Sequence, residues 1–581
     1  MSKSVVACLM SCALPFMAAA NDPVLLTAQQ VELYEAAKAD VSIRSFVSLS
    51  PFHQRMVSRI AAGNDTDTSS ARPAFCFSGP MPDDVMRLFN RSFFGVQKFE
   101  ENLFRWSETA TDGGGLVQGE PITLRYSFIP DGTMISGNAG IGNSNAPSNF
   151  QAFMTGIYGS VALWQAEFAQ AFAEWGDITG TTYVFEPNDD GGTFPDPDGP
   201  GGLPGLTGVR GDVRIGGYSI DGESGPSILA FNFFPNEGDM VFDTDNISFY
   251  SLTSGDSLLL RNVIAHEHGH GLGMPHTCPL NQTKLMEPSV SANFDGPQLD
   301  DRLSAQKHYG DANLGNSSIA AATDLGDLLD ETVTESLVSL SGNNEEDYYA
   351  FTLVATHEIV VTVAPEGETY VSGVQDELCD TGSAFSPQAF MNLDVQLIGP
   401  DGTTVLDTGN TAGIGAAETV GLDVAASGTY FLRVFTSGAA DNVQAYEVTV
   451  AASVLPGPVI TNPSGGGRVA LDEGSVTLSL SVSGTVDPTT YEWSKDGSPL
   501  FNTGTLSGAD TTALTIDPIE LQDSGAYRLT VTDSAAKLVT VSDAIVLEVV
   551  TALPVAGILA AGALAAGIVA AGAWTIRRRK N

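Results

Sequence analysis

Hydrophobic and polar positions follow three different patterns along the chain. From residue 21 to about residue 95, apolar side chains recur at helical spacing, as in TAQQVELYEAAKAD, and strand-like runs are few. From about residue 100 to 312, alternating runs such as ITLRYSF are mixed with helical stretches such as NFQAFMTGIYGSVALWQAEFAQAFAEWGDI. Beyond residue 312, short alternating runs such as EIVVTVAP take over. The patterns predict a helical N-terminal region at 21–99, an α/β domain at 100–312 and all-β domains after it.

The all-β part divides at the Pro- and Gly-rich stretch VLPGPVITNPSGGG into two predicted β-sandwiches, at 313–453 and 454–550. The first carries the run DYYAF at 347–351 and the run GTYFLRV at 428–434. These runs resemble strands of the pre-peptidase C-terminal domain of bacterial exoproteases. The resemblance implies a module that assists binding or secretion rather than chemistry.

The second sandwich resembles an immunoglobulin-like domain. The runs GSVTLSLSVSG, YEWSKDG and DSGAYRLTV follow one another in that family's order, with Trp493 as the core tryptophan and Tyr527 as the corner tyrosine. Leu480 and Leu529 stand where the family usually has its two disulfide cysteines. We therefore expect side-chain packing to stabilise this fold without that bridge.

The two ends of the chain carry patterns typical of export and anchoring. Residues 1–20 combine Lys3, an apolar run and small residues at cleavage spacing, which predicts a signal peptide removed after Ala20. Residues 551–581 hold a long apolar run that ends in RRRK, which predicts a transmembrane helix with its basic cluster in the cytoplasm. Because LPVAG precedes the apolar run, the segment also resembles bacterial sorting signals that sortase-like enzymes cut. The expected location is extracellular or at the cell surface.

Composition narrows the choice of partners. The 26 Lys and Arg against 69 Asp and Glu give a net charge of −43, which argues against nucleic acid and anionic membrane surfaces. Cations are the natural complement, although a general solubility role accounts for most of the carboxylates. Cys76, Cys278 and Cys379 remain after loss of the signal peptide. This odd and sparse set argues against a disulfide framework and leaves at least one thiol unpaired within the chain.

Four of the seven histidines lie in the run HEHGHGLGMPH, from His266 to His276. On a helix that turns about 100° per residue, His266 and His270 lie about 40° apart and can bind one metal ion. His268 lies on the far side of such a helix and is predicted to be no ligand. Glu267 stands beside the first ligand, where a carboxylate can deprotonate a metal-bound water without binding the metal itself.

The helix must end soon after His270 for a third ligand to come from nearby sequence. Gly273 can adopt the left-handed conformation that ends a helix, and Pro275 cannot continue it. His276 is then free to complete a three-histidine site with an open fourth position, which is typical of catalytic zinc. A bare H-E-x-x-H occurs by chance in unrelated helices, whereas the pattern with the glycine and the third histidine is far more specific.

The extended pattern is the metzincin signature, and its surroundings resemble the matrixin branch of that family. Thr277 stands where matrixins commonly have Ser, and KLMEPSV resembles the Met-turn, with Met286 beneath the zinc. LDDRLSAQKHYG resembles the matrixin C-terminal helix, in which His308 is expected to be a helix-end residue rather than a ligand. The resemblance covers about residues 100 to 312 and implies the α/β fold of a metzincin catalytic domain.

Matrixins also bind a structural zinc through histidines and a calcium through acidic residues, upstream of the zinc helix. Three positions match those of the calcium site: Asp221, Gly222 and Asp243. Asn246 stands where a Glu is usual, and Phe231 and Val241 occupy two of the histidine positions. We therefore expect the second zinc to be absent and the calcium site to be weakened.

The resemblance implies a zinc endopeptidase that acts on protein or peptide substrates. The three histidines would hold Zn²⁺, which lowers the pKa of a bound water, and Glu267 would be the general base. A peptide substrate would pair with the edge strand at about 227–233. Residues 277–300 would shape the pocket just past the scissile bond.

A latency device is a further expectation from the same resemblance. Many matrixins are kept inactive by a propeptide cysteine that binds the zinc. The stretch PAFCFSGPMPDDV around Cys76 contains a cysteine and a later PDDV run but lacks the family's Arg and its spacing. Because thiolate is a good zinc ligand, Cys76 is a candidate latency thiol. A plain buried or paired cysteine is the alternative.

Two other interpretations stay open at this point. The metzincin domain could have lost its activity, in a surface adhesion protein that binds through its sandwiches, but such a protein has no need of Glu267. The enzyme could also belong to another metzincin branch, although Thr277 and the Tyr309–Gly310 helix end favour the matrixins.

Overall fold

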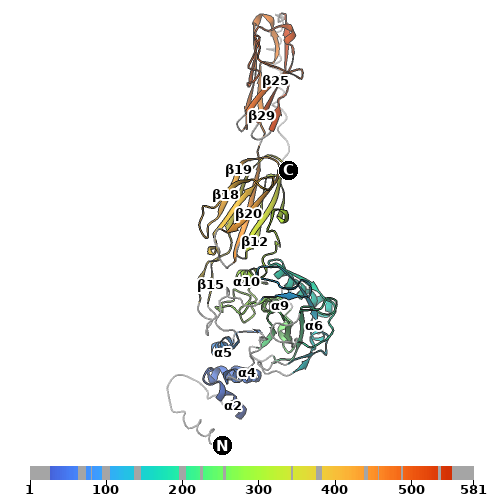
Figure 1. Cartoon of the computed structure of the whole chain (residues 1–581), viewed down its shortest axis with the longest axis vertical. Coiled ribbons are helices and arrows are strands. Elements are labelled where there is room, and N and C mark those ends of the chain that lie inside the picture. The colour runs from blue at the N-terminus through green and yellow to red at the C-terminus, as the bar shows by residue number, and fades with distance from the viewer. Residues whose placement is uncertain are drawn as a thin grey trace, which may run out of the picture.

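The computed structural model describes residues 26–62, 74–79, 81–93, 105–136, 145–194, 204–222, 227–252, 257–313, 315–341, 345–373, 382–436, 443–455, 457–485, 489–533 and 538–551. The domains follow one another in an elongated row (Figure 1). Short N-terminal helices lie against the α/β domain at one end, and the second sandwich forms the other end. The first sandwich is therefore the direct neighbour of the domain that carries the histidine motif.

Polar caps start the helices of the N-terminal region. Thr27, Ser42 and Ser50 each accept a hydrogen bond from a backbone N–H in the first turn of the helix that follows. The helices are α2 (Ala28–Ala37), α3 (Ile43–Ser48), α4 (Pro51–Ala61) and α5 (Asp83–Phe93). The region also contains a strand, β1 (Ala74–Phe77), whose four residues are all buried. A strand of four apolar residues needs cover on both faces, and the next domain supplies it.

The α/β domain is built on a six-stranded sheet with the order β1-β9-β10-β8-β4-β7. Its own strands are β4 (Ile122–Phe128), β7 (Thr181–Phe185), β8 (Val213–Tyr218), β9 (Ile228–Asn232) and β10 (Met240–Asp243). Strands β7, β4, β8 and β10 are parallel, and β9 is antiparallel to β10. Three helices pack on this sheet through one hydrophobic cluster: α6 (Phe150–Tyr158), α7 (Val161–Gly176) and α9 (Leu258–Gly271).

Smaller elements complete this domain. Two short pairs flank the sheet: β2 (Glu108–Thr109) with β3 (Gly113–Gly114), and β5 (Met134–Ile135) with β6 (Ala146–Pro147). The helix α8 (Ile247–Tyr250) precedes α9, and α10 (Leu299–Tyr309) ends the domain. Gly310 follows α10 with a φ of 71°, a conformation that favours glycine and stops the helix.

The sheet extends one strand further than the sequence predicts. We expected an edge strand at about 227–233, but β1 lies outside β9 and pairs with it in antiparallel fashion, from Ala74 opposite Asn232 to Phe77 opposite Ile228. The edge that a substrate would use is therefore covered by the chain's own N-terminal region.

An apolar cluster holds the N-terminal region in this place. Phe231 and Val241, which stand at histidine positions of matrixins, are buried in one cluster with Phe46 and Met56 from α3 and α4. The apolar side chains at these two positions pack against the N-terminal helices. Burial in such a cluster stabilises the docked N-terminal region by about 25 cal/mol for each Å² of apolar surface removed from water.

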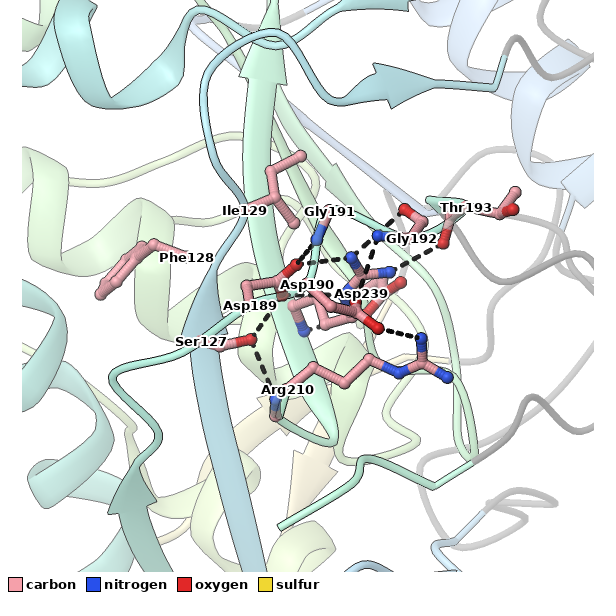
Figure 2. Close-up of polar contacts among 12 residues, drawn as sticks. Ser127, Phe128, Ile129, Asp189, Asp190, Gly191, Gly192, Thr193, Arg210 and Asp239 are labelled. Carbon is pink, nitrogen blue, oxygen red and sulfur yellow. Dashed lines mark hydrogen bonds and ion pairs between the residues drawn. The ribbon is translucent and has the colours of Figure 1, made fainter. Parts of the chain in front are cut away.

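A buried ion pair fixes the loop that follows β7. Arg214 on β8 donates to both carboxylate oxygens of Asp189, at 2.9 and 2.7 Å. Asp189 also accepts from Ser127 Oγ at 2.8 Å and from the Gly191 N–H at 3.0 Å (Figure 2). Burial by itself raises the pKa of Asp189, but the bonds and charge of Arg214 outweigh it and leave that pKa below its usual value. The loop is thus held by a satisfied charge pair rather than by an apolar core.

The first sandwich packs the sheet β11-β13-β20-β17-β18 against the sheet β12-β21-β14-β19. Its strands are β11 (Thr323–Leu328), β12 (Glu331–Leu340), β13 (Glu346–Leu353), β14 (His357–Pro365), β17 (Leu393–Ile398), β18 (Val405–Gly409), β19 (Glu418–Ala425), β20 (Gly428–Thr436) and β21 (Gln444–Val454). The two family-like runs lie on the paired strands β13 and β20, with Asp347 opposite Val434. A separate hairpin, β15 (Tyr370–Ser372) and β16 (Ser383–Phe385), projects from this sandwich.

The second sandwich packs β22-β24-β28-β27 against β23-β31-β29-β25-β26, with β30 beside β29. Its strands are β22 (Val459–Ser464), β23 (Gly467–Ala470), β24 (Val476–Ser483), β25 (Thr489–Lys495), β26 (Ser498–Pro499), β27 (Leu506–Ser507), β28 (Ala513–Ile516), β29 (Gly525–Asp533), β30 (Leu538–Val541) and β31 (Ile545–Val550). Trp493 is fully buried, and Tyr527 donates its hydroxyl proton to Asp523 O at 2.7 Å. Leu480 and Leu529 are buried in the same core, where the expected cysteines are replaced by packing.

The predicted signal peptide and the predicted C-terminal helix fall outside the described residues. Within the part of the chain that the structure describes, no helix is long and apolar enough to cross a membrane.

Candidate metal centre

Three histidines from one helix and the turn after it face one another. His266 and His270 lie one turn apart on α9, with 3.1 Å between their Nε2 atoms. His276 completes the triangle, with ring centroids 5.3 Å from His266 and 4.8 Å from His270. One nitrogen from each ring can be chosen so that all three lie within 4.8 Å of one another. Such a set of imidazoles suits one tetrahedral ion such as Zn²⁺.

The other ring nitrogens of the two helical histidines are held by carbonyl groups. His266 Nδ1 lies 2.7 Å from Leu285 O, and His270 Nδ1 lies 2.7 Å from Met274 O. A carbonyl accepts only from a protonated nitrogen, so each ring keeps Nε2 as a lone-pair donor for a metal. Burial also lowers the pKa of His266 to about 4, which keeps the imidazole neutral at physiological pH. The residues present therefore fit zinc.

A glycine turns the chain back after the helix. Gly273 has a φ of 101°, and the Met274 N–H donates to Gly269 O at 3.0 Å. This conformation is strained for any residue with a Cβ. The turn brings His276 under the helix and next to the two earlier ligands, as the sequence pattern predicts.

Glu267 lies between the first two ligands and is fully buried. Neither of its carboxylate oxygens makes a well-formed hydrogen bond within the described residues. Burial raises the pKa of this carboxyl well above its usual value, and the backbone N–H of Cys76 lowers it only in part. A buried carboxyl with high proton affinity next to a metal site is suited to accept and return a proton.

His268, the fourth histidine of the run, points to the opposite side of the helix. Its Nε2 lies 2.7 Å from the Tyr183 hydroxyl, and its ring packs against Phe172. Burial lowers its pKa to about 3, so the ring is neutral. It is a core histidine that anchors α9 to the sheet.

Met286 lies directly beneath α9. A Cβ added to Gly269 would come within 2.3 Å of Met286 Sδ, so only glycine allows the methionine to pack this closely. Asp301, at the start of α10, accepts hydrogen bonds from the Leu285 and Met286 N–H groups at 2.8 and 3.1 Å. In the sequence the two Asp residues of LDDRLSAQKHYG indicate only the family, and nothing there predicts this role of Asp301. His308, expected at the helix end, is buried and lies 3.3 Å from Gln118 Oε1 through its Nδ1.

The strand β1 lies between β9 and the segment at 288–290, next to these residues. On one side it pairs with β9. On the other side the Phe77 N–H donates to Pro288 O at 3.1 Å, and Phe77 O accepts from the Val290 N–H at 3.4 Å. The segment is therefore extended and hydrogen-bonded on both sides. Peptides that bind by strand addition adopt this arrangement.

Cys76 lies at the centre of this segment. Its Sγ belongs to a group with His266 and Glu267 whose ligand atoms lie within 4.8 Å of one another. The thiol is free and fully buried, and burial together with the nearby Glu267 raises its pKa well above the usual value. The thiol is therefore neutral in the described geometry and would lose its proton on binding a metal.

The comparisons with known proteins agree with this geometry. Residues 210–310 match the matrixin family model. Residues 345–436 match the bacterial pre-peptidase C-terminal domain and residues 457–533 match an immunoglobulin domain. The three predicted resemblances are thus confirmed, in the predicted order. The matrixin match contains the whole histidine motif and the turn at Met286.

Two kinds of relatives were found besides the family models. The decoration protein of Escherichia phage T5 is 34% identical over 93 residues, which are 16% of this chain and 53% of that protein. The chain therefore spans about half the length of this curated relative. Among solved structures, titin M4 is 25% identical, covers 16% of this chain and 96% of its own, and has a TM-score of 0.14. The human B7-H4 IgV-like domain is 14% identical, covers 16% and 95%, and has a TM-score of 0.12.

The candidate calcium residues of the matrixin domain form a buried acidic pair with an unexpected third member. The Asp221 N–H donates to Asp243 Oδ2 at 3.3 Å, and Gly222 follows with a φ of 81°. His53 of α4 places its Nε2 3.1 Å from Asp221 Oδ2, with both side chains buried. Burial and the neighbouring Asp243 raise the pKa of Asp221 to about 9. No local sequence signal marked His53, because its contact depends on how α4 docks.

Expectations from the sequence remain for Asn246, where matrixins usually have Glu, and for the cysteines. Asn246, at the position where Glu is usual, accepts a hydrogen bond from Ser227 Oγ at 2.6 Å. Cys278 is in a disulfide, whereas Cys76 is free. Cys379 lies outside the described residues.

Proposed function

We propose that the chain is an exported zinc endopeptidase that is inactive until its N-terminal region leaves the cleft. The observation that carries this proposal is the combination of three facing histidines, a buried Glu267 whose carboxylate lies within 4.8 Å of a ring nitrogen of His266, and an extended segment held between β9 and residues 288–290. A decayed adhesion module would not need to keep all of these groups together.

The reaction is hydrolysis of a peptide bond. A zinc ion held by His266, His270 and His276 would polarise the scissile carbonyl and lower the pKa of a water molecule. Glu267 accepts the proton of that water and returns it to the leaving amine. The water oxygen forms the new bond to the carbonyl carbon as the C–N bond breaks, so the two products are a carboxylate and an amine.

The substrate takes the place that β1 now occupies. Backbone groups of β9 on one side and of Pro288 and Val290 on the other would bind it as an extended strand. Main-chain bonds of this kind hold any sequence, so selectivity must come from side-chain pockets, which residues 277–300 would shape.

Latency follows from the same arrangement. Cys76 is delivered to the metal site by a strand that is hydrogen-bonded on both sides, and its thiolate would fill the open coordination position. Activation then requires the segment around β1 to leave, by cleavage or by displacement.

Calcium and anchoring are further parts of the proposal. Asp221 and Asp243 are suited to a hard cation, but a cation at Asp221 would have to displace the imidazole of His53. We propose that such a site forms only once the N-terminal region has left. The acidic surface and the two sandwiches suit a protein outside the cell, attached through residues 551–581.

The decisive experiment compares cleavage of casein or gelatin by the wild type and by Glu267→Ala, with and without a zinc chelator. Both proteins are also made with Cys76→Ser, so that latency cannot hide activity. The exposed Glu358 on β14 provides the matched control, Glu358→Ala. We expect loss of activity of at least about a hundredfold in Glu267→Ala alone, as for other general bases. Equal cleavage by wild type and Glu267→Ala would disprove the mechanism.

A further inference from the structure

The hairpin β15–β16 of the first sandwich reaches into the matrixin domain (Figure 1). Gly373, next to β15, donates its N–H to Cys278 O at 2.9 Å, and the two residues form an antiparallel bridge. On the β16 side, a Cβ added to Gly382 would lie 3.1 Å from Pro279 Cδ. The hairpin thus lies against the chain only two residues after the third histidine.

The same hairpin makes a second contact at the start of α10. The Tyr370 hydroxyl donates to Asp300 Oδ1 at 2.5 Å, and the Asp300 side chain is buried. Nearby, Arg302 forms an ion pair with Glu366 of the sandwich at 3.2 Å. The two ends of the loop between His276 and α10 are therefore both attached to the sandwich.

These contacts connect to the metal ligands through a short path. Asp301, the neighbour of Asp300, binds the Leu285 and Met286 N–H groups. Leu285 O in turn holds His266 Nδ1. At the start of the loop, directly after His276, the Thr277 N–H donates to Met286 O at 2.9 Å. Groups that hydrogen-bond to a metal ligand without binding the metal themselves orient metal-bound imidazoles.

We propose that the hairpin β15–β16 is part of the active-site framework and that Tyr370 is a positioning residue for His266. The inference rests on the proposed zinc site. The first sandwich is then no detachable accessory, because it fixes the loop that carries the Met-turn and forms the wall just past the scissile bond. Tyr370 acts by fixing Asp300, and with it the N-terminus of α10 and Asp301.

The test compares three full-length variants, each in the Cys76→Ser form. Tyr370→Phe removes only the hydroxyl. Tyr348→Phe is the matched control, because its hydroxyl bonds Glu346 within the same sandwich. Glu366→Gln weakens the ion pair with Arg302 but leaves the Tyr370 contact. Circular dichroism and the melting temperature check that each protein is folded.

Three measurements are made on each variant. The first is the rate of zinc loss to a chelator, and the second is hydrogen exchange at the Leu285 and Met286 amides in the zinc-free protein. The third is kcat and KM for a peptide substrate. For Tyr370→Phe we expect zinc loss and amide exchange about three- to tenfold faster than in wild type, below the range for direct partners of ligands. We expect kcat to fall while KM changes little.

Tyr348→Phe and Glu366→Gln should both behave like the wild type in all three measurements. Wild-type zinc retention and amide exchange in Tyr370→Phe would overturn the inference, and so would an equal effect in Glu366→Gln, because that result indicates general domain docking. Failure of the proposed function has a different signature. In that case no variant, including the wild type, cleaves peptides, while the amide-exchange comparison still reports on the hairpin.

Discussion

Cys76 Sγ lies in one group with a ring nitrogen of His266, within 4.8 Å, although the two residues are far apart in the sequence. The contact exists because β1 pairs with β9 and presents its central cysteine to the metal site. In the proposed function the pairing and the thiol would be separate means of inhibition: the strand would block substrate, and the sulfur would bind the metal.

The first prediction concerns this thiol. Cys76→Ser replaces a strong zinc ligand by a weak one, so the docked strand should be held less tightly and activity of the full-length protein should rise. A loss of about 1.4 kcal/mol from the closed state gives a tenfold gain. Cleavage of a quenched peptide by freshly purified protein measures it. Ser78→Ala, which removes a hydrogen bond to Ser227 at the end of the same segment, tests the strand alone. No gain in Cys76→Ser would rule out the latency role.

The grouping of the three histidines could be predicted because they lie close together in the sequence. The spacing of His266 and His270, the stop at Gly273 and the return of His276 all follow from helix geometry and from one glycine. The contributions of β1, His53 and Tyr370 were not predictable, since each depends on a partner from a distant segment. The run AFCF shows the problem: four apolar residues indicate a buried strand but carry no alternation that fixes its partner or register.

The second prediction tests the glycine stop. Gly273→Ala places a Cβ at a φ of 101°, which should cost at least about 1 kcal/mol and move His276 away from the other ligands. We expect a lower melting temperature and weaker zinc binding. Gly156→Ala is the control, because this glycine lies inside α6 with nothing within 4 Å of the added Cβ. That variant should be unchanged or up to about 1 kcal/mol more stable. Equal behaviour of the two variants would contradict the role of the turn.

Metal removal gives the third prediction. Zinc held by the three histidines would bind the folded domain and not the unfolded chain, so at about 100 times its Kd it would add about 2.7 kcal/mol to stability. Calorimetry should show the transition of this domain move to lower temperature with a chelator and return with added zinc. Among the described residues, those of the second sandwich contribute none of the clustered ligands, so this sandwich provides an internal control. In His270→Ala the chelator should have no effect, and an unchanged shift in that variant would place the metal elsewhere.

The fourth prediction concerns acid stability and His308. Burial, with the nearby charges of Arg105 and Lys307, lowers the pKa of His308 to about 3, against 6.5 for an unperturbed histidine. The folded state therefore binds the proton less readily than the unfolded state. The stabilising contribution of the neutral ring is fully present above pH 6.5 and is lost as the pH falls through 6.5 toward 3. Between pH 7.5 and pH 5 this amounts to about 2 kcal/mol.

His308→Gln removes this proton linkage and can keep a polar contact with Gln118. We expect the matrixin domain of the wild type to lose about 2 kcal/mol more than the variant on going from pH 7.5 to pH 5. Denaturant unfolding followed by tryptophan fluorescence measures the loss, because Trp106, Trp164 and Trp175 are all buried in that domain. The other buried histidines titrate in both proteins, so only the difference reports on His308. If the two proteins lost stability in parallel, His308 would not be held in its neutral form by the fold.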